Sequence, residues 1–219
     1  MIFRDRAAAG RDLAALLQRY RSEDPVVLGL VRGGVAVAAE VASALEAPLD
    51  VLVVRKVGVP GHPELAMGAV ASGVTWFNEP LIAELGIPRE EVDRVVQSET
   101  EEAERREALF REGHPTLPVQ GRTVILVDDG LATGATAVAG LRVLRRGGAH
   151  RLVFAAPVCS REGARRVERE ADELVCASRP DDFFAVSQAY RSFPQLTDTE
   201  VRQHLQAARP GAAGSGGLR

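Results

Sequence analysis

The sequence predicts a doubly wound α/β fold, in which a mainly parallel five-stranded sheet is flanked by helices. Short apolar runs alternate with segments of helical character along most of the chain. The first two runs and the helix between them form a unit of about 30 residues, which implies parallel pairing with a right-handed crossover. Polar or glycine-rich segments follow three of the runs, at the edge where ligands bind in such sheets.

Each expected element has a local signal. The apolar runs that we expect to form the strands are 26–30, 49–54, 123–127, 151–157 and 173–177. The helical segments are about 5–20, 35–46, 88–112, 136–146, 161–170 and 197–208, with a short one opening at Pro80. Asp5 and Ser160 are candidate N-caps, and Thr197 with Glu200 has capping-box spacing.

The segments between these elements are of three kinds. Residues 57–64 contain two glycines and two prolines and predict a flexible loop, whereas residues 65–77 are ambiguous and could hold short strands. An insert of about 76–120 carries the helix at 88–112, whose many Glu and Arg residues suggest a solvated helix with i,i+4 ion pairs. A lid, a hood and a dimer contact are the alternative roles for this insert. We expect a single domain over 1–208, and a disordered tail over the Gly/Ala/Ser-rich residues 209–219.

Composition excludes several classes of protein. The 27 basic residues include one lysine, Lys56, and 30 acidic residues bring the net charge to −3, which argues against a nucleic-acid partner. No apolar stretch suits a signal peptide or a membrane span, so no membrane partner is expected. The only two cysteines, Cys159 and Cys176, suit small buried residues in a reducing cytoplasm better than a disulfide framework.

The strongest chemical signal follows the third strand. Asp128 and Asp129 come directly after the apolar run, and a loop of small residues then leads into a helix. Free backbone N–H groups and the helix dipole make such a junction a phosphate cradle, to which Thr133 and Thr136 can add hydroxyl donors. A sugar phosphate with Mg²⁺ would satisfy both the cradle and the acid pair. A Walker A loop would need a lysine here, and the glycines after the first strand do not have the Rossmann spacing.

The segment VILVDDGLATGAT at 124–136 resembles the phosphoribosyl pyrophosphate (PRPP) signature of type I phosphoribosyltransferases. The resemblance extends over about 25–195 and departs from the family at Gly130, where an apolar residue is usual. A stretch at 62–70, HPELAMGAV, is similar to a poorly characterised bacterial branch of these enzymes.

The resemblance implies a role for each part of the site. Asp128, Asp129 and Lys56 would be catalytic, and the two acids would hold the ribose hydroxyls, directly or through Mg²⁺ and water. The residues implied to hold the 5′-phosphate are Ala132, Thr133, Gly134, Ala135 and Thr136. Those implied to hold the pyrophosphate are Arg32, Gly33, Gly34, Arg55 and Lys56, with a cis peptide expected between Arg32 and Gly33. The 57–75 loop would close over PRPP and exclude water.

The acceptor site is less well defined. Phe183 and Phe184 lie where relatives stack an aromatic ring on the base, and the Val186 backbone could read the edge of that base. A place for both phenylalanines in the hydrophobic core explains these residues equally well. His62 is a weak acid/base candidate, and Arg105 with Arg106 could reach phosphate, although a solvated face suits them better.

The resemblance therefore implies transfer of the 5-phosphoribosyl group of PRPP to a nitrogen acceptor such as a nucleobase, with release of pyrophosphate. Mg²⁺ is the implied cofactor, and a cytoplasmic homodimer is the implied setting. The alternative is a PRPP- or nucleotide-sensing regulatory protein that keeps the fold without catalysis.

Overall fold

The computed structural model describes residues 2–208 and confirms the predicted five-stranded parallel sheet. Its strand order is β2-β1-β6-β7-β8, and every neighbouring pair is parallel. The strands are β1 Val26–Leu30, β2 Leu49–Leu52, β6 Thr123–Val127, β7 Arg151–Val158 and β8 Glu173–Ser178. All residues of β1 and β6 are buried, as continuous apolar runs in the middle of a doubly covered sheet should be.

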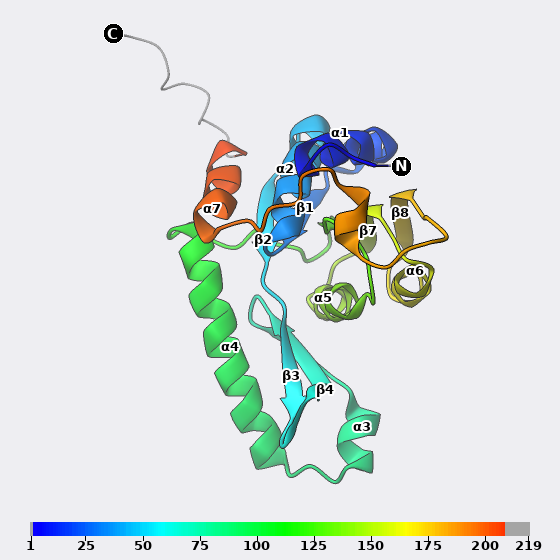
Figure 1. Cartoon of the computed structure of the whole chain (residues 1–219). Coiled ribbons are helices and arrows are strands. Elements are labelled where there is room, and N and C mark those ends of the chain that lie inside the picture. Colours follow the sequence, from blue (N-terminus) through cyan, green and yellow to red (C-terminus); the bar gives the residue numbers. More distant parts are fainter. Residues whose placement is uncertain (1, 209–219) are drawn as a thin grey trace.

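Helices cover both faces of this sheet (Figure 1). The helices are α1 Arg6–Leu17, α2 Gly33–Leu45, α5 Ala135–Arg146, α6 Arg161–Val167 and α7 Asp198–Ala207, and a 3₁₀ segment at Gln18–Glu23 follows α1. Apolar side chains of α1 and α2 pack with Ile125 and Val153 on one face. Those of α5 and α6 pack with Leu126 and Phe154 on the other face, so alternate residues of each strand belong to different cores.

The helix caps expected from the sequence are present. The Asp5 carboxylate accepts the backbone N–H of Ala8 at 2.8 Å, and the Ser160 hydroxyl accepts that of Gly163 at 2.8 Å. Thr197 and Glu200 form the reciprocal capping box at the start of α7. These caps fix where the segments that border the carboxyl edge of the sheet turn into helix.

The segment expected to be a loop at 57–64 is instead part of a second sheet, and that expectation was wrong. An antiparallel sheet, β3-β4-β5, is formed by β3 Arg55–Val59, β4 His62–Ala71 and β5 Val74–Phe77. Pro60 and Gly61 make the tight turn between β3 and β4, with Gly61 at φ 78°. The glycines and prolines therefore serve a hairpin, because the buried Val57, Val59 and Met67 hold its strands against a core.

The strand assignment of Arg55 and Lys56 also needs correction. The second strand was expected over 49–54 with these two residues directly after it, but β2 ends at Leu52 and both residues begin β3. The apolar run continues through Val53 and Val54 because these residues carry the chain from one sheet to the other and are packed there. A continuous apolar run does not reveal such a change of sheet.

Residues 55–111 form an arm that extends away from the five-stranded sheet (Figure 1). It comprises β3, β4, β5, α3 Glu79–Glu84 and α4 Arg89–Arg111, so the expected helices at Pro80 and 88–112 are confirmed. The long helix α4 packs on β3 and β4 with Val92, Ala103 and Phe110. Its remaining surface is rich in Glu and Arg, as expected of a solvated helix.

A buried ionic cluster joins the arm to the main sheet. Arg111 at the end of α4 donates to Asp50 of β2 at 2.9 Å and to Glu107 at 2.6 Å. The Glu107 carboxylate also accepts from the backbone and hydroxyl of Ser72, at the turn between β4 and β5. All three charged side chains are less than one-tenth exposed. The cluster therefore fixes the helix, the hairpin and the edge strand relative to one another.

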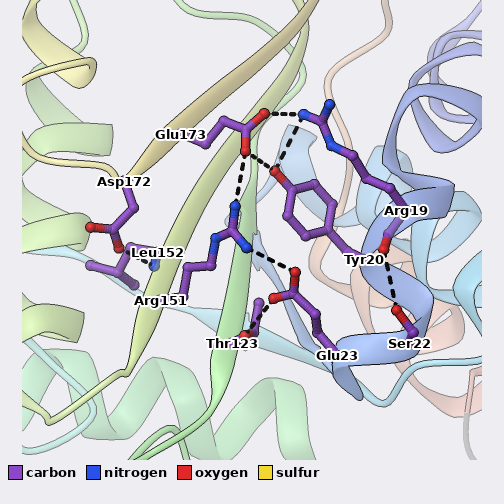
Figure 2. A network of polar contacts seen from close by, with 9 residues as sticks. All are labelled: Arg19, Tyr20, Ser22, Glu23, Thr123, Arg151, Leu152, Asp172 and Glu173. Atoms are coloured by element: carbon purple, nitrogen blue, oxygen red, sulfur yellow. Dashed lines mark hydrogen bonds and ion pairs between the residues drawn. The ribbon is translucent and has the colours of Figure 1, made fainter.

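A second polar network closes the amino edge of the sheet (Figure 2). Glu173 at the start of β8 accepts from Arg151 of β7 and from the Tyr20 hydroxyl. Arg151 also donates to Glu23 at 2.8 Å, which accepts the Thr123 hydroxyl at 2.9 Å. The segment after α1 is thereby tied to three strand starts, and this edge is occupied by structural contacts.

Among residues 2–208, no helix has the length and apolar character needed to cross a membrane. The tail expected to be disordered, 209–219, lies outside the described residues.

Candidate functional site

The candidate site lies where the chain changes direction across the sheet. From β1 the chain passes through α2 to β2 on one side, and from β6 it passes through α5 to β7 on the other. Because β1 and β6 are neighbours, the loops that follow them begin side by side at the carboxyl edge of the sheet. This is the point at which ligands bind in doubly wound sheets.

Two carboxylates, Asp128 and Asp129, follow β6 at this edge of the sheet. The backbone N–H of Asp128 donates to Ala155 of β7 at 3.1 Å, which continues the sheet by one residue. Burial raises the pKa of the Asp128 carboxyl well above its usual value, and the negative charge of Asp129 raises it further. Burial also raises the pKa of Asp129, while the hydrogen bond and the charge of Arg6 lower it in part. The pair is therefore suited to hydroxyl donors or a cation.

Asp129 is held by two residues that sequence reasoning missed. Nε of Arg6 donates to its Oδ2 at 2.8 Å, and the Tyr190 hydroxyl donates to its backbone carbonyl at 2.5 Å. Burial raises the pKa of Tyr190, so its hydroxyl stays protonated and able to donate. No local pattern links these residues, because 123 positions separate Arg6 from Asp129.

The loop after β1 packs directly on the acid pair. Gly33 faces the Asp129 carboxylate, and an added Cβ would collide with Oδ2. A Cβ on Gly34 would lie 2.9 Å from Asp128 Cα and 2.5 Å from the Val127 carbonyl. The two glycines therefore let the loops of β1 and β6 touch, which gives the predicted pyrophosphate loop a place beside the predicted ribose acids.

The cis peptide lies one bond earlier than expected, between Val31 and Arg32. Gly33 is the first residue of α2, and Arg32 is its N-cap.

Replacing Gly33 by alanine should disable the site. The new methyl group has to displace the Asp129 carboxylate, because that group occupies the same space. We expect the affinity for PRPP to fall at least about tenfold, which corresponds to roughly 1.4 kcal/mol. Calorimetric titration with PRPP measures the loss. Gly147→Ala is the control for the substitution itself, because φ there is −71° and an added Cβ meets no atom closer than 3.4 Å. Equal affinities for the Gly33→Ala chain and the wild type would contradict the close packing.

The loop from β6 to α5 keeps its polar groups available. Ala132, Thr133, Ala135 and Thr136 are exposed, and no side chain caps the start of α5. Gly134 adopts φ 76°, a left-handed conformation that glycine tolerates and that turns the chain into the helix. Free backbone N–H groups at the positive end of a helix dipole bind phosphate well.

The underside of this loop is fixed by residues that follow β7. The Ser160 hydroxyl donates to the Ala132 carbonyl at 2.5 Å, and Arg166 donates to the Thr133 carbonyl at 3.3 Å. Gly163 has no room for a side chain because the Ala132 carbonyl lies against it. Sequence reasoning identified Ser160 only as a cap, and its second role depends on β6 and β7 being neighbours.

The predicted diphosphate-binding cations have different surroundings. Nη1 of Arg32 lies 3.7 Å from Oδ1 of Asp198 in α7, and Nε of Arg55 donates to Oε2 of Glu99 in α4 at 2.7 Å. Lys56 is exposed on β3, opposite Ala69 of β4. The sequence spacing gave no sign that acidic residues of distant helices would meet the two arginines.

The predicted base-binding residues Phe183 and Phe184 have different surroundings in the structure. Phe183 packs with Val158 and Tyr190, whereas Phe184 is 83% exposed. Gln188 accepts the backbone N–H groups of Phe184 and Ala185, which fixes the segment that carries the exposed ring. The side chain of Val186 covers Gly130, and this close contact explains the glycine where the family usually has an apolar residue.

The remaining candidates lie elsewhere. His62 is an exposed residue of β4, and Arg105 and Arg106 pair with Glu102 on the solvated face of α4. Cys159 is buried as expected, but Cys176 is only partly buried. Within residues 2–208, no cluster of three or more His, Cys, Asp or Glu side chains has the arrangement of a metal site. A cation at the acid pair would need further ligands from a substrate or water.

Comparison with known proteins places these features in a family. The sequence profile of the phosphoribosyl transferase domain matches residues 4–192. The Mycobacterium tuberculosis protein Rv0571c, provisionally named a phosphoribosyl transferase, is 45% identical over 218 residues. That alignment covers 99% of this chain and 49% of the relative, so the chain spans about half the length of the curated relative.

A solved structure shows the same fold. The crystal structure of TT1426 from Thermus thermophilus superposes with a TM-score of 0.86 at 42% identity, covering 94% of this chain and 98% of that one. The profile match includes the acid pair and the loops that follow β6 and β1. The chain therefore belongs to the phosphoribosyl transferase domain family.

Proposed function

We propose that this chain transfers the 5-phosphoribosyl group of PRPP to a nitrogen acceptor, with release of pyrophosphate. The observation that carries the proposal is the meeting of two carboxylates, Asp128 and Asp129, with the uncapped start of α5 at the carboxyl edge of the neighbouring strands β1 and β6. A ribose phosphate needs hydroxyl acceptors and a phosphate cradle about one sugar apart. Few other ligands use both.

Residues 132–136, the phosphate loop, would hold the 5′-phosphate. Thr133 and Thr136 would donate hydroxyl hydrogen bonds, while the backbone N–H groups of Gly134, Ala135 and Thr136 would donate the rest. Ser160 and Arg166 would keep the loop in shape from below through the carbonyls that they contact. The phosphate would thus be held by a preformed cradle.

The acid pair would hold the ribose hydroxyls. Both carboxyls have raised pKa values because they are buried, and hydroxyl donors would relieve this cost. Negative charge beside the sugar would also stabilise the positive charge that develops at the anomeric carbon as pyrophosphate leaves. The buried acids would therefore favour the transition state over the ground state.

The donor set at the acid pair fits Mg²⁺. Carboxylate oxygens are hard ligands of the kind that Mg²⁺ prefers, and two of them suffice when phosphate oxygens and water complete its octahedron. Asp128 and Asp129 would hold the ion, directly or through water. When bound, it would supply neutralising charge for the diphosphate.

The departing pyrophosphate would lie against Gly33 and Gly34, the first residues of α2. Free backbone N–H groups at the start of this helix would donate to the anion, and Arg32, Arg55 and Lys56 would supply positive charge. Lys56 is the one best suited to follow a leaving group, because it is an exposed ammonium on a flexible stem.

The acceptor would enter beside the segment that carries Phe184. Its exposed ring, on a backbone fixed by Gln188, is suited to stacking on a flat nucleobase. The Val186 backbone remains the proposed contact for the edge of the base.

Pyrophosphate release tests the proposed reaction. The chain is incubated with Mg²⁺, PRPP and a panel of purine and pyrimidine bases, and pyrophosphate is measured for each. We expect release that depends on one class of base. PRPP binding by calorimetry without base-dependent release from any acceptor would reject the transferase and favour a sensing role.

Lys56→Ala should lower turnover about tenfold or more while PRPP affinity falls less, because the charge acts mainly on the leaving diphosphate. The fold should be unaffected, since the side chain is exposed. Steady-state kinetics give kcat and KM, and Arg89→Ala, at an exposed position on α4, controls for loss of a surface cation from the arm. An unchanged kcat would remove Lys56 from the mechanism.

A further inference from the structure

Arg6 has an environment that the proposed reaction does not explain. It is the first residue of α1, yet its guanidinium turns inward and Nε donates to Oδ2 of Asp129 at 2.8 Å. The side chains of Arg6 and Asp129 are only 10% and 14% exposed. Two charges shielded from water in this way imply a specific arrangement rather than a surface ion pair.

The guanidinium is also held on two other sides. Nη1 donates to the backbone carbonyl of Pro194 at 2.6 Å, and the central guanidinium carbon lies 3.8 Å from the ring centroid of Phe193. The Phe193 ring in turn stacks on Tyr190 at a centroid distance of 4.8 Å. A planar cation with several donors can make these contacts together, whereas a lysine ammonium could not.

These contacts join both ends of the described chain above the acid pair. Arg6 comes from the amino end, and Phe193 and Pro194 come from the segment before α7. Tyr190 belongs to that same segment and donates to the Asp129 carbonyl at 2.5 Å. Asp129 is therefore held through its side chain by Arg6 and through its backbone by Tyr190, while Gly33 closes the third side.

We infer that Arg6 is a positioning residue that orients the Asp129 carboxylate toward the ribose hydroxyls; the inference rests on the proposed function. Arg6 stays in place when the sugar binds, because leaving would break the bond to Pro194 and the contact with Phe193 as well as the ion pair. Because Arg6 occupies Oδ2 of Asp129, a ribose hydroxyl would donate to Oδ1. Arg6 thus selects which carboxylate oxygen faces the sugar.

Binding of the two parts of PRPP, measured separately, distinguishes this positioning role from a merely structural one. Ribose 5-phosphate has the hydroxyls that Asp129 would accept, whereas inorganic pyrophosphate has none. Arg6→Gln should weaken ribose 5-phosphate binding about tenfold or more, the usual loss for one charged hydrogen bond. Pyrophosphate affinity should change by less than about twofold, because the loop that binds it keeps its own contacts. Calorimetric titration of each ligand gives both affinities.

Three variants complete the test. Arg4→Gln removes an equal charge from an exposed side chain two residues away and should leave both affinities unchanged. Arg6→Lys keeps the charge without the planar donors and should recover part of the lost affinity. Phe193→Leu removes the ring beneath the guanidinium, and it provides the same selective loss if Arg6→Gln does not fold.

The outcomes are distinct. A loss confined to ribose 5-phosphate supports the positioning role. Equal losses for both ligands, or no loss, overturn it while leaving the proposed function intact. If the wild-type chain binds neither ligand, the proposed function itself fails and the inference fails with it.

Discussion

Asp129→Asn should reduce phosphoribosyl transfer about 100-fold or more, the usual effect of removing one preorganised electrostatic group. The amide keeps the shape of the carboxylate and can still accept from Arg6, so the loops after β1 and β6 should keep their positions. What is lost is the negative charge beside the anomeric carbon. Pyrophosphate release at saturating PRPP and acceptor measures the change in kcat.

Two measurements accompany this result. Asp93→Asn, at an exposed position on α4, should leave turnover unchanged and shows the effect of the chemical substitution alone. Circular dichroism of the Asp129→Asn chain should show the helical content of the wild type. A kcat close to that of the wild type would mean that Asp129 is not part of the chemistry.

Arg111→Leu should destabilise the fold by about 3–5 kcal/mol, the usual cost of leaving buried charges without their partner. The side chains of Asp50 and Glu107 are both less than one-tenth exposed, and both carboxylates form ion pairs with the Arg111 guanidinium. Removing it leaves two like charges together in the joint between the arm and the sheet. Urea unfolding followed by circular dichroism gives the free energy of unfolding.

Arg106→Leu is the matched control, since Arg106 lies on the same helix and pairs with Glu102 at the surface. Its loss should be within about 0.5 kcal/mol, as for most surface changes. Equal stabilities of the Arg111→Leu and Arg106→Leu chains would show that the buried cluster does not hold the arm.

The sheet could be predicted because its strands are encoded locally. Runs such as 26–30 and 123–127 are apolar at almost every position, and only a strand covered on both faces accommodates that pattern in so few residues. Helix starts at Asp5, Ser160 and Thr197 were predictable for the same reason, since a cap is formed by neighbours in sequence. The error at 57–64 arose because glycine and proline mark a turn without showing whether paired strands flank it.

For the candidate site, too, the features that are local in sequence could be predicted and those that depend on the fold could not. The acid pair and the phosphate loop are contiguous in sequence, so their types and spacing alone indicated a sugar phosphate. The pairing of Arg55 with Glu99 was not visible, because it depends on where the arm folds back. The contact between Val186 and Gly130 could likewise not be predicted, because only the folded chain brings these two residues together.

The sequence by itself determined the doubly wound fold and the succession of the main-sheet strands and helices along the chain, because each depends on neighbours within one element. Only the tertiary structure decided what holds Asp129 in place and how the arm is joined to the sheet. Arg6, Tyr190 and Gly33 meet Asp129 from three distant parts of the chain, and Asp50, Glu107 and Arg111 meet in the same way. A buried charge selects its partners by position in space, and that selection leaves no periodic trace in the sequence.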